Sequence, residues 1–214
     1  VRTSLYDEHL VLDANMVDFH GFELPIWYSN IKEEHLETRR TAGLFDVSHM
    51  GSFRFSGTHV REWLEGLATQ RGAAIVAGRC AYTHFLDENG HLIDDMIFAV
   101  VSENEILGVP NASMIGVMWE WFSKHLPGDG SVQLENLSDD MSILALQGPM
   151  AKQYLTSVIG EGQHVARFKW ATITDNPLGI TGWIQGTGYT GEAGYEIFIP
   201  NNDAPVLWLS LIHI

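Results

Sequence analysis

The sequence is poor in cysteine and in basic residues, and it lacks any long apolar run. Cys80 is the only cysteine among 214 residues, so no disulfide can form within the chain. No stretch of 18 apolar residues could cross a membrane, and the first ten residues lack the apolar core of a secretion signal. From these absences we expect a cytoplasmic protein without a membrane partner.

Acidic residues outnumber lysine and arginine by 27 to 12, which gives a formal net charge of −15 at pH 7. A field of that sign repels phosphate backbones, so we expect no nucleic-acid partner. The ten histidines show no HxH or HExxH spacing, so we predict no metal site. His84 and His91 flank the turn DENG and are interpreted as solvated turn residues, with a role in a site as the alternative.

Hairpins dominate the predicted secondary structure. Residues 80–86 and 92–101 flank the turn DENG, a hairpin signature. Further strands are predicted at 51–57, 105–109, 131–137, 142–147, 166–175, 179–187 and 195–200. Helices are predicted over 30–43 (closed by Gly43), from a cap at Thr58 to Leu67, over 111–126 (capped by Asn111 or Ser113) and from Pro149 to Ile159. This pattern indicates an α+β fold of mostly antiparallel sheets with flanking helices.

The segment GTGYTG, residues 186–191, matches the dinucleotide-binding pattern GxGxxG. That pattern needs a helix after the glycines to hold the pyrophosphate, whereas residues 195–199 here indicate a strand. We therefore exclude dinucleotide binding. Two interpretations stay open: the glycines only permit a turn, or they bring the backbone close to a ligand and present Tyr189 and Glu196.

Two adjacent carboxylates, Asp94 and Asp95, lie in a predicted strand, where Asp is rare. Side chains alternate across a strand, so each aspartate shares its own face with apolar neighbours. At least one carboxylate should then be partly buried. Either both reach solvent or a backbone N–H at the start of the strand, or one faces a ligand that carries positive charge or N–H donors.

Five segments together resemble the aminomethyltransferase family, the tetrahydrofolate-dependent T-protein of the glycine cleavage system. They are MVDFHGFELPIWY (16–28), LFDVSHMG (44–51), CAYTHFLDENGHLIDDMIF (80–98), ALQGP (145–149) and GTGYTGEAGYE (186–196). They occur in the order and spacing of that family, and the resemblance covers residues 4 to 208. It implies a folate-binding, aminomethyltransferase-type fold.

The resemblance also implies roles for single residues. Asp95 matches the family's active aspartate. The folate contacts would be Tyr82, Asn111, Glu196 and, on weaker grounds, Tyr189. An apolar surround of Ile97 and Val109 would cover the folate ring. The alternatives are a strand aromatic for Tyr82, a helix cap for Asn111 and a solvent-facing strand position for Glu196.

In the family's reaction, a one-carbon unit passes from an aminomethyl-lipoyl carrier protein to tetrahydrofolate, and ammonia is released. Tetrahydrofolate and the lipoyl carrier are therefore the expected cofactor and partner. The chain departs from the family at Gly186, where an Arg is usual, and at Ala193, where an Asp is usual. The segments FHGF (19–22) and ATQ (68–70) replace FAGW and TND.

These departures concern the one-carbon donor more than the folate. The alternatives are a folate-dependent demethylase of a methylated amine or sulfonium compound and a non-catalytic folate-binding accessory protein. We expect residues 1–50 and 140–208 to form a first, discontinuous folate-binding subdomain, and residues 51–139 to form an inserted second α+β subdomain. Residues 209–214 depart from the family and are expected to be a non-native tail on a chain truncated before the family's C-terminal barrel.

Overall fold

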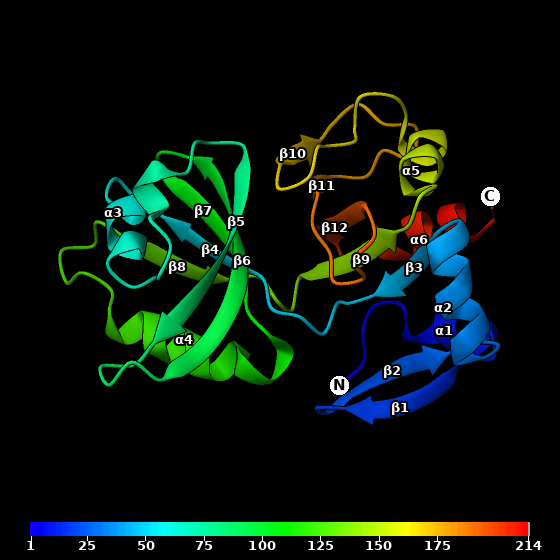
Figure 1. Ribbon diagram of the computed structural model, residues 1–214, viewed down its shortest axis with the longest axis horizontal. Helices are drawn as coiled ribbons and strands as arrows, with labels where there is room; N and C mark the ends of the chain where they lie inside the picture. Colours follow the sequence, from blue (N-terminus) through cyan, green and yellow to red (C-terminus); the bar gives the residue numbers. More distant parts are fainter. Residues whose placement is uncertain (214) are drawn as a thin grey trace. The chain divides into compact units, whose positions relative to one another are not determined.

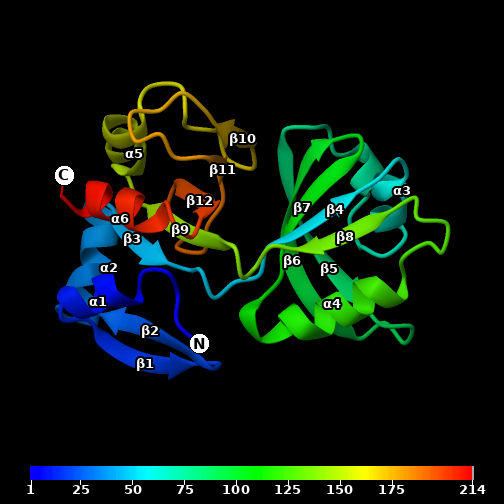
Figure 2. The same cartoon turned by 180° about the vertical axis from the view of Figure 1, so that it is seen from behind.

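The computed structural model describes residues 1–213, which divide into two compact units. Unit 1 contains residues 1–49, 140–167 and the chain from 171 onward, and unit 2 contains residues 50–139 with 168–170 (Figures 1 and 2). The division into a discontinuous first subdomain, 1–50 with 140–208, and an inserted second subdomain, 51–139, stays a prediction.

Unit 2 is built on an antiparallel sheet with the strand order β5-β6-β7-β4-β8. The strands are β4 (Phe53–Ser56), β5 (Arg79–Leu86), β6 (Leu92–Ser102), β7 (Glu105–Val109) and β8 (Gln133–Asn136). The helices are α3 (Val60–Glu65), η1 (Gly72–Ala74), η2 (Ala112–Met114) and α4 (Ile115–Lys124). One face of the sheet packs on these helices through a core rich in phenylalanine, including Phe53, Phe55, Phe85, Phe98 and Phe122.

The predicted hairpin of β5 and β6 is confirmed, and the turn residues explain why it forms. The Asp87 carboxylate accepts hydrogen bonds from the backbone N–H groups of Asn89 and His91, both at 2.8 Å. Gly90 has a φ of 82°, which glycine adopts without steric cost. The His91 ring lies 3.1 Å from Asp87, while His84 lies opposite Asp95 in the strand register.

Unit 1 contains a sheet with the order β10-β11-β12-β9-β3 and a separate hairpin of β1 and β2. The strands are β1 (Asn15–Phe19), β2 (Phe22–Trp27), β3 (Gly43–Asp46), β9 (Met141–Gln147), β10 (Trp170–Ile173), β11 (Gly182–Gln185) and β12 (Gly194–Pro200). The helices are α1 (Tyr6–Val11), α2 (Ile31–Arg40), α5 (Ala151–Ile159) and α6 (Ala204–Ile212). Helix α6 continues into the expected tail, and Leu211 is buried in the core of the unit.

Three predicted helix ends are wrong by a few residues. Helix α2 ends at Arg40, and Gly43 is instead the first residue of β3. A Cβ at Gly43 would lie 2.4 Å from the Thr38 hydroxyl, so close packing explains this glycine. Helix α3 begins after His59 without a side-chain cap, so Thr58 does not cap it. Helix α5 begins at Ala151, two residues after Pro149.

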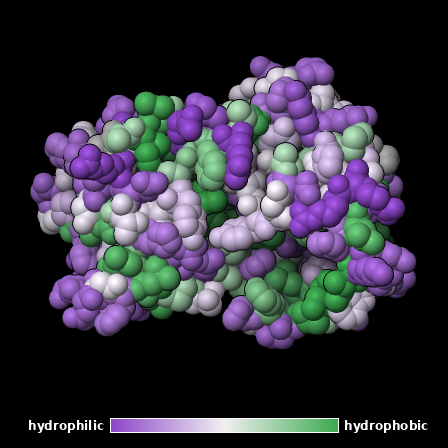
Figure 3. Space-filling view, in the orientation of Figure 1, coloured by the Kyte–Doolittle hydropathy of each residue, from purple (hydrophilic) through white to green (hydrophobic). Residues whose placement is uncertain are grey.

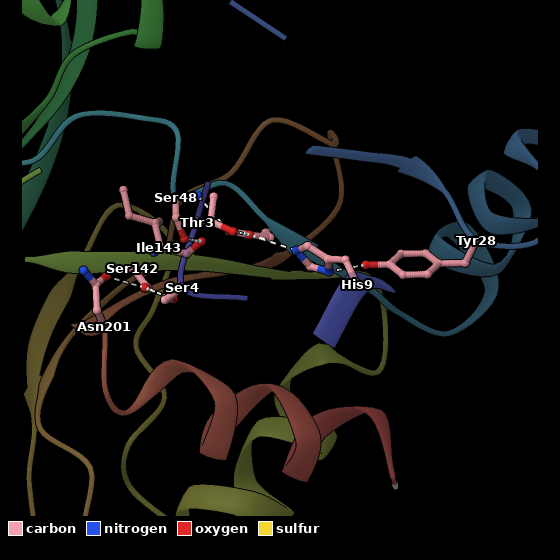
Figure 4. A network of polar contacts seen from close by, with 9 residues as sticks. Thr3, Ser4, His9, Tyr28, Ser48, Ser142, Ile143 and Asn201 are labelled. Carbon is pink, nitrogen blue, oxygen red and sulfur yellow. Dashed lines mark hydrogen bonds and ion pairs between the residues drawn. The ribbon is translucent and has the colours of Figure 1, made fainter. Parts of the chain in front are cut away.

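A buried polar network joins the first helix of unit 1 to its sheet (Figure 4). His9 Nε2 lies 3.0 Å from Asp46 Oδ2, and both side chains are fully buried. Because an ionised carboxylate only accepts hydrogen bonds, Nε2 carries the proton, and Nδ1 accepts from the Tyr28 hydroxyl at 2.9 Å. Thr3 donates to the same carboxylate at 2.6 Å. Burial raises the pKa of Tyr28, which keeps its hydroxyl protonated as a donor.

Among the described residues, no helix is long and apolar enough to span a membrane. Hydrophilic side chains cover much of the face in Figure 3. Exposed apolar side chains are concentrated in the N-terminal segment, where α1, β1, β2 and α2 contribute Leu10, Val11, Phe19, Ile26 and Ile31.

Candidate functional site

The two aspartates of β6 have different environments. Asp94 is 5% exposed and points toward the core with Met96 and Phe98, whereas Asp95 is only partly buried on the opposite face. Burial raises the pKa of Asp94 above its usual value, although hydrogen bonds from Asn111 oppose the shift. The expectation that at least one carboxylate is partly buried is confirmed, and the more buried one is Asp94.

Asn111 explains how a carboxylate is tolerated at position 94. Its side-chain Nδ2 donates to Asp94 Oδ1 at 2.7 Å and to the Asp95 carbonyl oxygen at 2.9 Å. Its backbone N–H donates to Asp94 Oδ2 at 3.3 Å. Asn111 makes no side-chain cap on the following helix, so the helix-cap alternative is wrong. Both oxygens of Asp94 are therefore engaged in joining β6 to the segment after β7.

Four of the predicted site residues share one face of the unit 2 sheet. Tyr82 on β5 lies opposite Ile97 on β6, and Ile97 lies opposite Val109 on β7. Asp95 lies two residues before Ile97, so its side chain is on the same side. We call the surface formed by Tyr82, Asp95, Ile97 and Val109 the open face, because its side chains are partly or largely exposed and point away from the phenylalanine core.

On the open face, the Tyr82 hydroxyl donates to Asp95 Oδ2 at 2.7 Å. This bond fixes the orientation of the carboxylate. Among the described residues, no hydrogen bond to Asp95 Oδ1 is found. The arrangement presents a fixed, partly exposed carboxylate next to two aliphatic side chains, which suits a flat ligand with N–H donors or positive charge.

In unit 1, Gln147 forms hydrogen bonds with the glycine-rich segment between β11 and β12. Gln147 is fully buried, and its Nε2 donates to the carbonyl oxygens of Thr187 at 3.1 Å and Tyr195 at 3.2 Å. Its Oε1 accepts from the Thr190 hydroxyl at 2.9 Å. A Cβ at Gly188 would lie 2.1 Å from that oxygen, so the glycine is needed for close approach.

Arg39 on α2 also binds the glycine-rich segment. It donates to the Thr190 carbonyl at 2.6 Å and pairs with the Glu192 carboxylate at 2.9 Å. The segment leads into a strand, β12, and not into a helix. Its polar groups at Thr187, Thr190 and Glu192 are bound by the side chains of Gln147 and Arg39. This geometry agrees with excluding a dinucleotide loop.

The two predicted site residues of unit 1 differ in exposure. Tyr189 is 71% exposed. Glu196 on β12 is 9% exposed and accepts a hydrogen bond from the Thr187 hydroxyl. Burial raises the pKa of Glu196, and the bond from Thr187 only partly offsets that effect. The solvent-facing alternative for Glu196 is thus wrong, because its side chain is buried. No metal-binding group of His, Cys, Asp or Glu side chains is present within the described part of the chain.

Over residues 5–214, the sequence matches the family described as the GCVT N-terminal domain. The chain belongs to this family. The aminomethyltransferase of Chlorobaculum parvum is 40% identical over 213 residues, covering 99% of this chain and 58% of that protein. The aminomethyltransferase of Bacillus cereus is 38% identical over 215 residues, covering 100% and 58%. This GCVT chain therefore spans less than two thirds of the length of these relatives.

Solved structures show the same fold. The glycine cleavage system aminomethyltransferase T from Bartonella henselae superposes with a TM-score of 0.91 at 29% identity, covering 99% of this GCVT chain and 57% of that one. A heterotetrameric sarcosine oxidase from a Corynebacterium superposes with a TM-score of 0.63 at 14% identity, which shows the shared fold alone. The expected α+β, aminomethyltransferase-type fold is confirmed.

Within the GCVT fold, the structure brings Tyr82, Asp95, Ile97 and Val109 together, with Asn111 bonded to the Asp95 backbone. Tyr189 and Glu196 belong to the other unit. Sequence reasoning missed the roles of Gln147 and Arg39. The motif ALQGP contains Gln147, but its contacts with Thr187, Thr190 and Tyr195 bridge 40 or more residues, so no local pattern could have assigned them.

Proposed function

We propose that this chain is the folate-binding part of a cytoplasmic, tetrahydrofolate-dependent aminomethyltransferase of the glycine cleavage system. The partner is a lipoyl carrier protein loaded with an aminomethyl group. The reaction forms two bonds from the transferred carbon to the folate nitrogens, and it breaks the bonds from that carbon to sulfur and to the amine nitrogen. The two folate N–H protons pass to the lipoyl sulfur and to the departing ammonia.

The observation that carries the proposal is the Tyr82–Asp95 pair on the open face. Positive charge develops on the transferred carbon and on the folate nitrogen that attacks it. A carboxylate held in place by Tyr82 stabilises that charge without having to reorganise during the reaction. Ile97 and Val109 offer the apolar surface that a folate ring needs.

Asp94 is unsuited to this role because it is buried and both its oxygens accept hydrogen bonds from Asn111. We assign it to positioning the strand ends, together with Asn111. Tyr189 and Glu196 are retained as further folate contacts of the proposal. Glu196 supplies a carboxyl group for a ligand N–H, and Tyr189 supplies an exposed aromatic ring.

The test is carrier-dependent release of ammonia by the full-length protein. Aminomethyl-loaded lipoyl carrier, tetrahydrofolate and enzyme are combined, and ammonia and methylenetetrahydrofolate are measured together. We expect both products in equal amounts, and only slow release of ammonia when folate is omitted. Turnover of a methylated amine or sulfonium donor without ammonia release from the carrier would contradict the proposal, and so would folate binding without turnover of any donor.

A further inference from the structure

His84 lies next to the open face of unit 2, on the same side of the sheet. It belongs to β5 and follows Tyr82 by two residues, so the two side chains point to the same side. His91, the other histidine of this hairpin, is largely exposed and lies against Asp87 in the turn. The interpretation as a solvated turn residue therefore fits His91, whereas His84 has a half-buried place inside the strand.

The backbone pairing brings the side chains of His84 and Asp95 close together. His84 lies opposite Asp95 in the register of β5 and β6. The N–H of His84 donates to Thr69 Oγ1 at 3.2 Å, and its carbonyl oxygen accepts from the Thr69 N–H at 3.0 Å. Both backbone groups thus point away from β6, which makes His84 and Asp95 a non-hydrogen-bonded pair. The Cα atoms of such a pair are about 4.5 Å apart, the closest spacing in an antiparallel sheet.

Tyr82 contacts both members of this pair. Its hydroxyl donates to Asp95 Oδ2 at 2.7 Å. Its ring meets the His84 ring edge to face, with centroids 5.0 Å apart and an interplanar angle of 82°. The imidazole is thus packed against the same tyrosine that holds the carboxylate, and the three side chains form one cluster.

Polar atoms of this cluster are left open to a ligand. The histidine ion pairs found within residues 1–213 belong to His9 and His91, and in the same range neither ring nitrogen of His84 has a hydrogen bond. Asp95 accepts through Oδ2, and its Oδ1 is open. An acceptor oxygen and an imidazole therefore stand side by side. An amine nitrogen suits this arrangement, because it can donate to a carboxylate and exchange a proton with an imidazole.

We infer that His84 is a catalytic acid–base residue, which carries a proton from the folate nitrogen to the departing amine. This inference rests on the proposed function, because it takes the folate and the aminomethyl donor at the open face as given. Neutral His84 accepts the proton that the folate nitrogen loses when it bonds to the transferred carbon. When the bond from that carbon to the amine breaks, the electron pair stays on the amine nitrogen. His84 gives its proton to this nitrogen, which leaves as ammonia, and the imidazole is neutral again.

The kinds of side chain in the cluster support this division of roles. A histidine gains and loses a proton readily near neutral pH, whereas a carboxyl group and a phenol do so far from it. The Tyr82 hydroxyl is already engaged as a donor to Asp95. General acid–base catalysis by one positioned side chain contributes about 10²–10⁴ in rate. Because His84 is only half-buried, water can replace part of its action, and we expect the lower end of that range.

The first test is carrier-dependent ammonia release by the full-length protein with His84→Ala. Turnover should fall by roughly 10², and free imidazole should restore part of it in proportion to its concentration. Imidazole should not rescue Asp95→Asn, because that variant lacks a charge and not a proton carrier. His91→Ala removes a histidine from the same hairpin and should keep the turnover of the wild type.

His84→Gln separates proton transfer from a structural role. Glutamine keeps a hydrogen-bonding side chain of similar size but cannot carry a proton, so this variant should melt close to the wild type and lose as much turnover as His84→Ala. Turnover of His84→Gln near that of the wild type would overturn the inference, since a hydrogen bond alone would then suffice. A loss in His84→Ala that imidazole does not restore would also overturn it.

A second test needs no turnover. Diethyl pyrocarbonate modifies accessible histidines, and mass spectrometry of the full-length protein gives the rate at each one. 5-Formyltetrahydrofolate should slow the modification of His84 severalfold and leave His91 unchanged. If calorimetry shows that the compound is bound while the rate at His84 is unchanged, the inference is wrong and folate binding stands. A wild type that releases no ammonia from loaded carrier would overturn the proposed function together with this inference.

Discussion

Replacement of Asp95 by Asn should abolish most of the catalytic activity and leave the fold intact. The substitution keeps the size of the side chain and an oxygen that can accept from Tyr82, but it removes the negative charge. Opposite unit charges about 4 Å apart attract by about 4 kcal/mol at an effective dielectric constant of about 20. That energy corresponds to about a thousandfold in rate.

Asp95 is partly exposed, so solvent screens part of this attraction. We therefore expect turnover to fall by roughly 10² to 10³, the range found when a single electrostatic contact to a transition state is removed. The Michaelis constant for tetrahydrofolate should change less than turnover, because the charge develops mainly in the transition state.

The matched control is Asp94→Asn, one residue away on the same strand and with the same loss of charge. An amide oxygen at position 94 can still accept the 2.7 Å bond from Asn111 Nδ2. Burial of the carboxylate already raises the pKa of Asp94, so removal of its charge also removes a desolvation cost. Its turnover should stay close to that of the wild type.

The assay is the initial rate of carrier-dependent ammonia release by both variants of the full-length protein, with circular dichroism as the check on folding. A larger loss for Asp94→Asn would mean that the catalytic carboxylate lies on the buried face. Equal small losses would refute the electrostatic role of both aspartates.

Three further predictions concern stability and are checked by chemical or thermal unfolding. Gly188→Ala should destabilise the chain by roughly 1–3 kcal/mol because the added methyl group overlaps Gln147. The control is Gly128→Ala, where no atom lies within 4 Å of the added carbon. Equal stability of the two variants would refute the role of Gln147. Asn111→Ala should cost roughly 1–3 kcal/mol because it removes the side-chain donor to buried Asp94, and a variant as stable as the wild type would contradict that role. Asp46→Asn should cost roughly 1–3 kcal/mol near neutral pH because an amide cannot accept all the hydrogen bonds that the buried carboxylate receives from Thr3, His9 and Ser48. Burial alone would raise the pKa of Asp46, but hydrogen bonds from His9, Ser48 and Thr3 together hold it below the usual value. Because this pKa is lowered, the contribution of Asp46 to the free energy of unfolding is complete above its unfolded pKa of about 4. It is lost as the pH falls through the folded pKa. The stability cost of Asp46→Asn should therefore shrink in acid, and a cost that is independent of pH between about 2 and 6 would contradict this linkage.

The hairpin of β5 and β6 could be predicted because its signals are local. The turn DENG and the alternation on both sides lie within about 20 residues, and Asp87 closes the turn through contacts two and four residues away. The same alternation predicted that Asp94 and Asp95 face opposite ways. It could not predict which of them is buried, because that depends on the core beneath the sheet.

Helix ends and buried contacts between distant segments could not be predicted from the sequence. Gly43 looked like a helix terminator, yet its place is set by the packing of Thr38 and Phe45 around the start of β3. Asn111 looked like a helix cap, but Asp94, 17 residues earlier, competes for its side chain and binds it instead.

Hydrogen–deuterium exchange with and without 5-formyltetrahydrofolate tests the central claim most directly, because it reports which backbone segments a reduced folate protects. Our account predicts slower exchange in peptides covering residues 79–86, 92–102 and 105–111, with a second protected region at 186–196. Asp95→Asn should keep the same pattern, since the substitution acts on the transition state more than on binding. Folate binding that leaves β5, β6 and β7 unprotected, or protects only α2 and the β1–β2 hairpin, would contradict the assignment of the open face as the folate site.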